Sequence, residues 1–74
     1  MRNDIIDFDG LIRELEARDF FAAHSDTGIY VERYDSETLT SRDLDEIYDV
    51  ASSFSGVDVY LDDTGYRANI EFLR

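Results

Sequence analysis

The sequence contains neither cysteine nor lysine, and it has no long run of apolar residues. Without cysteine the chain forms no disulfide and offers no thiolate ligand to a metal ion. Without a long apolar run it has no segment expected to span a bilayer, and no signal-peptide core follows its first residues. We therefore expect a soluble, cytoplasmic protein that does not contact membranes.

Negative charge is what the sequence has in excess. Eighteen aspartates and glutamates accompany only seven basic residues, all of them arginines, for a formal net charge of -11. Such a surface favours cationic partners and disfavours direct binding to nucleic acid or to anionic membranes. Apolar residues still make up 43% of the chain, too many for a disordered polyanionic tail. We expect one folded domain, residues 1–74, that carries its function on the outer surface.

Apolar residues recur at helical spacing in two segments of the chain. They predict helices over residues 5–18 and 41–54, the first capped by Asp4 or Asp7 and the second by Thr40 or Ser41. Two strand-like segments joined by a turn follow each helix. The predicted strands are residues 20–24, 29–34, 57–61 and 66–72.

The order helix, strand, strand therefore occurs twice, in halves of about 1–37 and 38–74. Sequence identity between the halves is thin, so a duplication and two unrelated units both fit the pattern. We predict an α+β fold in which two helix-hairpin (αββ) units form a four-stranded antiparallel sheet with both helices on one face. The pattern does not fix the order of the strands.

The tripeptide Asp-Thr-Gly occurs in both halves, at Asp26-Thr27-Gly28 and at Asp63-Thr64-Gly65. It resembles the motif of aspartic proteases, in which two such aspartates share one proton. The residues on either side differ from that family's pattern, and the chain is too short for a peptide cleft with a covering flap. A hairpin turn with glycine in the left-handed conformation accounts for both copies.

Other candidate sites for chemistry are few. His24 is the single histidine, and no serine or acid stands beside it in a catalytic arrangement. Asp7 with Asp9, and Asp62 with Asp63, are acidic pairs, but their spacing does not match a calcium-binding loop. We expect no catalytic residue, no cofactor and no dedicated metal site, and hence a protein that is not an enzyme.

Carboxylates and tyrosines supply the candidate binding surface. The second predicted helix is acidic outside its apolar stripe, with Arg42 as its only nearby countercharge, whereas the first helix is partly neutralised by Arg18, four residues after Glu14, and by Arg13. Strand alternation directs further acids and tyrosines, including Tyr34, outward, where they form either an interface or an ordinary solvated face. The predicted partner-binding residues are Asp43, Asp45, Glu46, Asp49, Asp58, Tyr60, Asp62, Asp63, Tyr30 and Glu32.

The segment Leu11-Ile12-Arg13-Glu14-Leu15, followed by Arg18-Asp19-Phe20, resembles the opening helix of a small acidic phage-encoded anti-CRISPR inhibitor of a CRISPR nuclease. Beyond this helix the order of elements differs, since that inhibitor has a three-stranded sheet with helices afterwards. The wider resemblance is to small acidic phage proteins that imitate nucleic acid. It implies a non-catalytic inhibitor in the host cytoplasm that occupies the basic groove of a nuclease complex.

The charge pattern supports the same hypothesis independently, because neighbouring carboxylates on a helix or strand lie about 5–7 Å apart, near the phosphate repeat. Two alternatives stay open. Aspartate in excess of glutamate, with arginine replacing lysine, is also typical of proteins adapted to molar salt. An immunity or antitoxin-type protein would use an anionic surface as well. We expect a monomer or a weak homodimer.

Overall fold

The computed structural model describes residues 7–54 and 56–72, and it confirms the α+β class. Asp4 and residues 5 and 6, which fall in the first predicted helix and its cap, lie outside the described residues. The strands agree closely with the predicted segments, while the second helix ends at Ala51 instead of residue 54. The elements are α1 (Phe8–Ala17), β1 (Phe20–His24), β2 (Gly28–Arg33), α2 (Ser41–Ala51), β3 (Val57–Leu61) and β4 (Arg67–Phe72).

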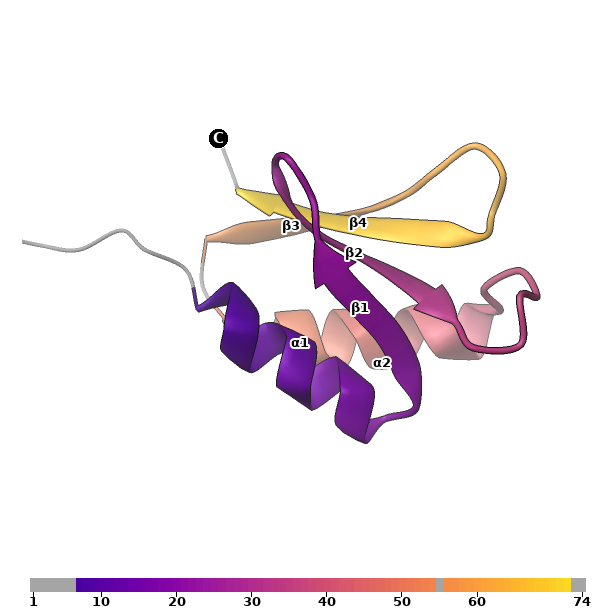
Figure 1. Cartoon of the computed structure of the whole chain (residues 1–74), viewed down its shortest axis with the longest axis horizontal. Helices are drawn as coiled ribbons and strands as arrows, with labels where there is room; N and C mark the ends of the chain where they lie inside the picture. Colours follow the sequence, from indigo (N-terminus) through magenta and orange to yellow (C-terminus); the bar gives the residue numbers. More distant parts are fainter. Residues whose placement is uncertain (1–6, 55, 73–74) are drawn as a thin grey trace, which may run out of the picture.

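The four strands form one antiparallel sheet in the order β1-β2-β4-β3. The second strand of each hairpin therefore lies at the centre, and β1 and β3 form the two edges. Both helices lie against one face of the sheet (Figure 1), where α1 packs on β1 and β2, and α2 packs on α1 and β3. No described element covers the other face, which we call the outer face.

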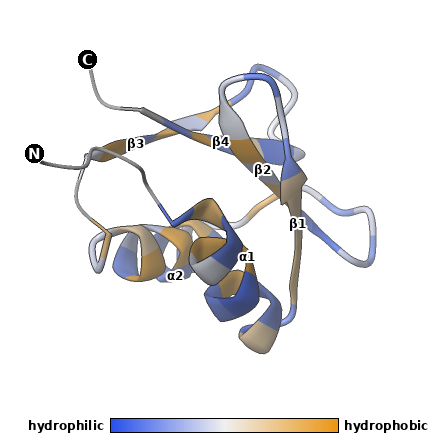
Figure 2. Ribbon diagram, turned by 60° about the vertical axis from the view of Figure 1, so that its left-hand side comes forward, coloured by the Kyte–Doolittle hydropathy of each residue, from blue (hydrophilic) through white to orange (hydrophobic). Residues whose placement is uncertain are grey.

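The hydrophobic core fills the space between the helices and the sheet. Buried apolar residues of both helices and of the sheet make up this core, and Figure 2 colours the hydrophobic positions of these elements orange. The strands alternate between core and outer face. Several core side chains have no solvent-exposed surface at all: Leu11, Leu15, Ile29, Val31, Ile47, Ala68 and Ile70. No polar or charged residue in the described part of the chain is buried, so every described carboxylate is at least partly at the surface.

Side-chain caps fix where the helices begin. The Asp7 carboxylate accepts a hydrogen bond from the Gly10 amide at the start of α1. At the start of α2, Thr40 and Asp43 form a capping box, in which each side chain accepts a hydrogen bond from the other residue's backbone amide. The Asp43 carboxylate is thus already engaged at the helix start, which makes Asp43 a weaker candidate for binding a partner.

The two Asp-Thr-Gly turns are built differently, although the sequence predicts the same turn for both. Gly65 has a φ of 78°, in the left-handed region as expected. Gly28 does not adopt a left-handed φ, so the prediction is wrong there. Instead, a Cβ at Gly28 would lie 2.1 Å from the carbonyl oxygen of Ile70, so glycine is needed because two strands approach closely.

Candidate partner-binding surfaces

The predicted partner-binding residues do not form one surface. Four of them lie on α2 and thus on the side of the helices, which we call the helix side. Tyr30, Glu32, Asp58 and Tyr60 alternate with core residues of β2 and β3 and so lie on the outer face. Asp62 and Asp63 lie in the β3–β4 turn. The sheet separates the first two groups, so a single flat partner surface contacts one or the other.

On the helix side, Arg33 at the end of β2 binds two carboxylates. Its guanidinium donates to Asp43 at 2.9 Å and to Asp35 at 2.9 and 2.6 Å. These hydrogen bonds raise the pKa of Arg33 and lower the pKa of Asp35 to about 2. The Asp43 pKa is lowered although partial burial opposes the shift, because the Thr40 amide and Arg33 both donate to its carboxylate. These three side chains form a structural clasp between β2, the connecting loop and α2.

Arg18, which follows α1, neutralises acids of α2 and not of its own helix. Its guanidinium lies 3.0 Å from the Asp49 carboxylate and 4.0 Å from that of Glu46. The structure therefore corrects the view that Arg42 is the only countercharge near these acids, and that Arg18 pairs with Glu14. Arg18 follows the last helical turn, so its long side chain extends across to the neighbouring helix.

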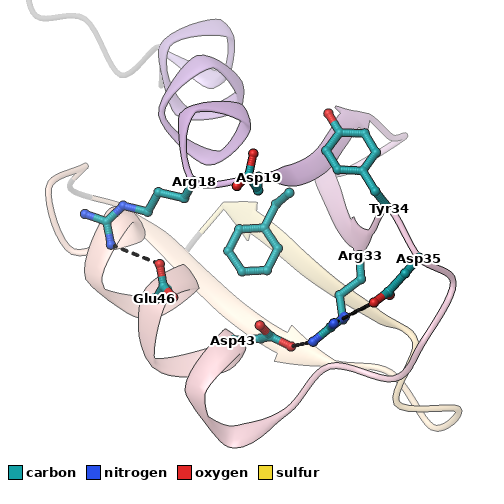
Figure 3. Close-up of a pocket in the computed structure, with 8 residues that line it drawn as sticks. Arg18, Asp19, Arg33, Tyr34, Asp35, Asp43 and Glu46 are labelled. Atoms are coloured by element: carbon teal, nitrogen blue, oxygen red, sulfur yellow. Dashed lines mark hydrogen bonds and ion pairs between the residues drawn. The ribbon is translucent and has the colours of Figure 1, made fainter.

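An open groove of about 390 Å³ lies between these two arginines. Figure 3 shows Arg18 and Glu46 on one side of it and Arg33 with Asp35 and Asp43 on the other. The remaining lining residues are Asp19, Phe20 and Tyr34. Of the acids predicted on α2, only Asp45 makes no hydrogen bond or ion pair through its carboxylate with another described residue. The groove's polar groups are mainly satisfied by one another.

The outer face carries an aromatic and ionic group that is centred on Tyr30. The Arg67 guanidinium lies 4.1 Å from the centroid of the Tyr30 ring and 2.8 Å from the Glu32 carboxylate. Phe21 of β1 packs beside Tyr30, with the ring centroids 5.9 Å apart, and Tyr34 packs on Phe21 at 6.2 Å. One arginine of this chain is therefore held on the outer face by an aromatic ring and a carboxylate together.

Farther along the outer face, two carboxylates stand side by side. Asp58 of β3 is directly opposite Glu71 of β4, so both side chains project from the same face. Asp58 accepts a hydrogen bond from the Tyr60 hydroxyl at 3.1 Å, and Glu71 accepts one from Thr27 at 2.8 Å. Neither makes an ion pair with another described residue. Like charges at directly opposite positions destabilise a sheet, so this pair costs stability in the isolated chain.

The turn acids have unequal roles. The Asp62 carboxylate accepts hydrogen bonds from the amides of Thr64 and Gly65 and from the Thr64 hydroxyl, and these bonds lower its pKa. Asp62 therefore shapes the turn, as aspartate commonly does. Asp63 is exposed and makes no such bond. The sequence reasoning placed both in the binding surface but did not distinguish them.

Sequence reasoning missed Phe21, Arg67 and Glu71 as members of the outer face. Strand alternation was the available signal, because it assigns residues 67, 69 and 71 to one face of β4. The sequence did not reveal which strands are neighbours, because the pairing of β2 with β4 exists only in the folded sheet. The contact of Arg67 with Tyr30 and Glu32 follows from that pairing.

The remaining candidates show structural roles. His24 lies 2.8 Å from the Asp9 carboxylate and joins the end of β1 to the first turn of α1. Asp26 and Asp63 lie in turns at opposite ends of the sheet, so they cannot share a proton as in an aspartic protease.

Among residues 7–54 and 56–72, no group of three or more potential ligands is placed to hold a metal ion. No helix in those ranges has the length and apolar character to cross a membrane.

No family model matches the sequence, and neither the curated proteins nor the solved structures yield a match.

Proposed function

We propose that this protein is a non-catalytic acidic inhibitor that binds a basic nucleic-acid-binding protein and keeps nucleic acid from it. A CRISPR effector is the kind of partner that the first helix's resemblance suggests. The partner's arginine- and lysine-lined groove would receive carboxylates of this chain where it otherwise receives phosphates.

The observation that carries the proposal is how the charges are distributed. Arg18, Arg33 and Arg67 are each bound to carboxylates of the chain itself. Most other acids make no ion pair with another described residue, and no described carboxylate is buried. The surface field therefore stays strongly negative after internal pairing, which attracts a cationic partner over a long range.

The directions of the pKa shifts do not suit general acid catalysis by these carboxyl groups. Every resolved pKa shift among the described residues stabilises a charged form: the pKa of Arg33 is raised, and those of Asp35, Asp43 and Asp62 are lowered. General acid catalysis at neutral pH needs a carboxyl group with a raised pKa. Shifts of the opposite sign suit carboxylates that hold arginines and turns in place.

The test is competition with DNA. The immobilised protein is exposed to host-cell extract at about 0.15 M salt, and retained proteins are then challenged with duplex DNA. We expect nucleic-acid-binding proteins to be retained and DNA to release them. We also expect the free protein to displace labelled duplex DNA from a purified captured protein.

Polyglutamate of the same net charge is the matched control, because it supplies the charge without the fold. We expect this protein to displace DNA at a concentration at least about tenfold lower, since its carboxylates are held in fixed positions. Equal potency of polyglutamate, or retention of proteins that DNA does not release, would contradict the proposal.

Adaptation to molar salt is the second candidate, and one structural observation favours it. Because Arg18 pairs with α2, it does not neutralise the first helix, and exposed acids occur on the helices, the turns and the outer face alike. Thermal melting over a range of salt concentrations separates the two candidates. We expect a cooperative transition at about 0.05 M salt for the inhibitor, whereas a fold that forms only in molar salt supports salt adaptation.

A further inference from the structure

We infer that the outer face of the sheet is the surface that docks the basic partner, and that it recognises arginine side chains of that partner in preference to lysine. This inference rests on the proposed function, and it names the surface and the side chain involved. Its two supports are both contacts on the outer face.

The first support is the way in which the chain holds its own Arg67. The guanidinium lies 4.1 Å from the centroid of the Tyr30 ring, and its Nε and Nη2 atoms lie 2.9 and 2.8 Å from a Glu32 carboxylate oxygen. Tyrosine and carboxylate therefore already act together as a guanidinium site on this face. A planar guanidinium stacks on an aromatic ring while it donates to an acid in its own plane, which an ammonium group does not do.

The second support is a similar combination of groups on the other half of the face. Asp58 and Glu71 are directly opposite each other. Tyr60 lies two residues after Asp58 on β3, and half of its surface is exposed. No described basic residue pairs with these two acids. An incoming arginine would contact the aromatic ring and neutralise two adjacent carboxylates at once. It would thereby remove the repulsion that the isolated chain carries.

The register places these two groups within reach of one partner segment. Tyr30 and Tyr60 are both paired with Asn69, so they lie in one row across three strands, about 10 Å apart. Phe21, 36% exposed, and Tyr34, 63% exposed, extend the aromatic surface toward the β1 edge. Tyrosine and arginine are both enriched at interface hot spots, and a guanidinium stacks favourably on a tyrosine ring.

Charge decides between the conceivable occupants of this face. A second copy of this chain would bring Glu32, Asp58 and Glu71 against the same acids of its partner, at a net charge of -11 for each chain. The helix side is less suited to a partner, because Arg18 and Arg33 already pair with three of the four acids that border its groove. An arginine-rich segment complements the outer face in charge and in shape.

The experiment uses two synthetic peptides of equal length, one of alternating arginine and glycine and one of alternating lysine and glycine. Each is titrated into the isotopically labelled full chain at about 0.15 M salt, and amide chemical shifts are followed by NMR. We expect the arginine peptide to bind at least about threefold more tightly than the lysine peptide. Its largest shifts should fall on β2, β4 and β3.

The double variant Asp58→Asn with Tyr60→Ala should weaken arginine-peptide binding by about fivefold. The matched control, Glu16→Gln with Tyr48→Ala, removes one acid and one similarly exposed tyrosine from the helix side and should change binding less than about twofold. If the first variant unfolds, Glu71→Gln alone, which keeps every aromatic ring, should still weaken binding more than Glu16→Gln.

The other outcomes overturn the inference in distinguishable ways. Shifts centred on α2, or equal weakening by both double variants, would place the contact elsewhere and leave the proposed function standing. Equal affinity for the two peptides would refute recognition of arginine. Association of the free protein through the outer face would make a second copy the occupant. No binding of either peptide would contradict both the inference and the proposed function.

Discussion

The helix side and the outer face contain the same kinds of residue, yet their carboxylates differ in whether an arginine of the chain pairs with them. On the helix side, Arg18 and Arg33 each bridge two carboxylates, and the acids of α2 are largely engaged. On the outer face, Arg67 serves Glu32, while Asp58 and Glu71 stand together without a described basic partner. The residues that lie beside an acid in the folded protein therefore decide its role. An acid paired with an arginine is structural, whereas an acid without a described basic partner is left to bind a ligand.

The difference matters most for α2, which looks in the sequence like the strongest anionic surface. A run of acids on one helix suggests a ligand site, but its like charges also recruit arginines from elsewhere in the same chain. The outer face carries fewer acids, and two of them lie where they repel each other. Repulsion that the fold leaves in place is the better indication of a missing partner.

The largest predicted effect distinguishes two neighbouring acids of α2. Asp43→Ala removes the capping box and one ligand of Arg33, so we expect a loss of about 1–2 kcal/mol in the free energy of unfolding. Asp45→Ala removes an exposed carboxylate without such contacts and should change that free energy by less than about 0.5 kcal/mol. Urea denaturation of both variants measures the contrast, and equal losses would show that Asp43 is not a structural residue.

Much of the fold could be predicted from the sequence, for local reasons. Thr40 precedes the apolar stripe of α2, and alternation in residues 57–61 marks a strand with one face in the core. The same alternation placed Tyr30, Glu32, Asp58 and Tyr60 on one face, as the register of the sheet has them. These features depend on residues close together in the chain.

The rest depends on residues that are distant in the sequence. Arg18 has Glu14 one helical turn before it, so local spacing favoured that pair, but the folded chain places Asp49 within 3.0 Å. Gly28 occupies a sequence position that is typical of a left-handed turn residue. Glycine is required there, however, because the carbonyl of Ile70 on another strand lies close to it. Neither contact is visible before β2 and β4, or α1 and α2, are known to be neighbours.

A second prediction concerns the acid sensitivity of the clasp on the helix side. Arg33 lowers the pKa of Asp35 from 3.8 to about 2 in the folded protein. Because the folded-state pKa is the lower one, the stabilisation is complete above the unfolded pKa and is lost as the pH falls through the folded one. The stability difference between the wild type and Asp35→Asn should therefore be largest from about pH 5 upward, shrink as the pH falls toward 2, and vanish only below pH 2.

Urea unfolding of both proteins at each pH gives this difference, and comparing the two cancels the titration of the other acids. The control is Asp45→Asn, which removes an exposed α2 carboxylate that makes no hydrogen bond or ion pair with another described residue, so its difference from the wild type should be smaller than that of Asp35→Asn near pH 5. A difference for Asp35→Asn that is as large at pH 2 as at pH 5 would mean that its charge does not act through Arg33.

The smallest predicted effect tests whether the outer face holds both a satisfied and an unsatisfied acid. Glu32→Gln breaks the ion pair with Arg67 and should lower the free energy of unfolding by about 0.5 kcal/mol. Asp58→Asn removes the repulsion with Glu71, while its amide oxygen still accepts from Tyr60, so it should raise that free energy by about 0.3 kcal/mol.

Both effects should shrink in about 1 M salt, where exposed charges are screened within a few ångströms. Opposite signs at low salt are the decisive result, because Glu32 has Arg67 beside it whereas Asp58 has Glu71. A loss of stability on Asp58→Asn would show that the pair with Glu71 is not repulsive, and the outer face would lose its strongest reason for binding a cationic partner.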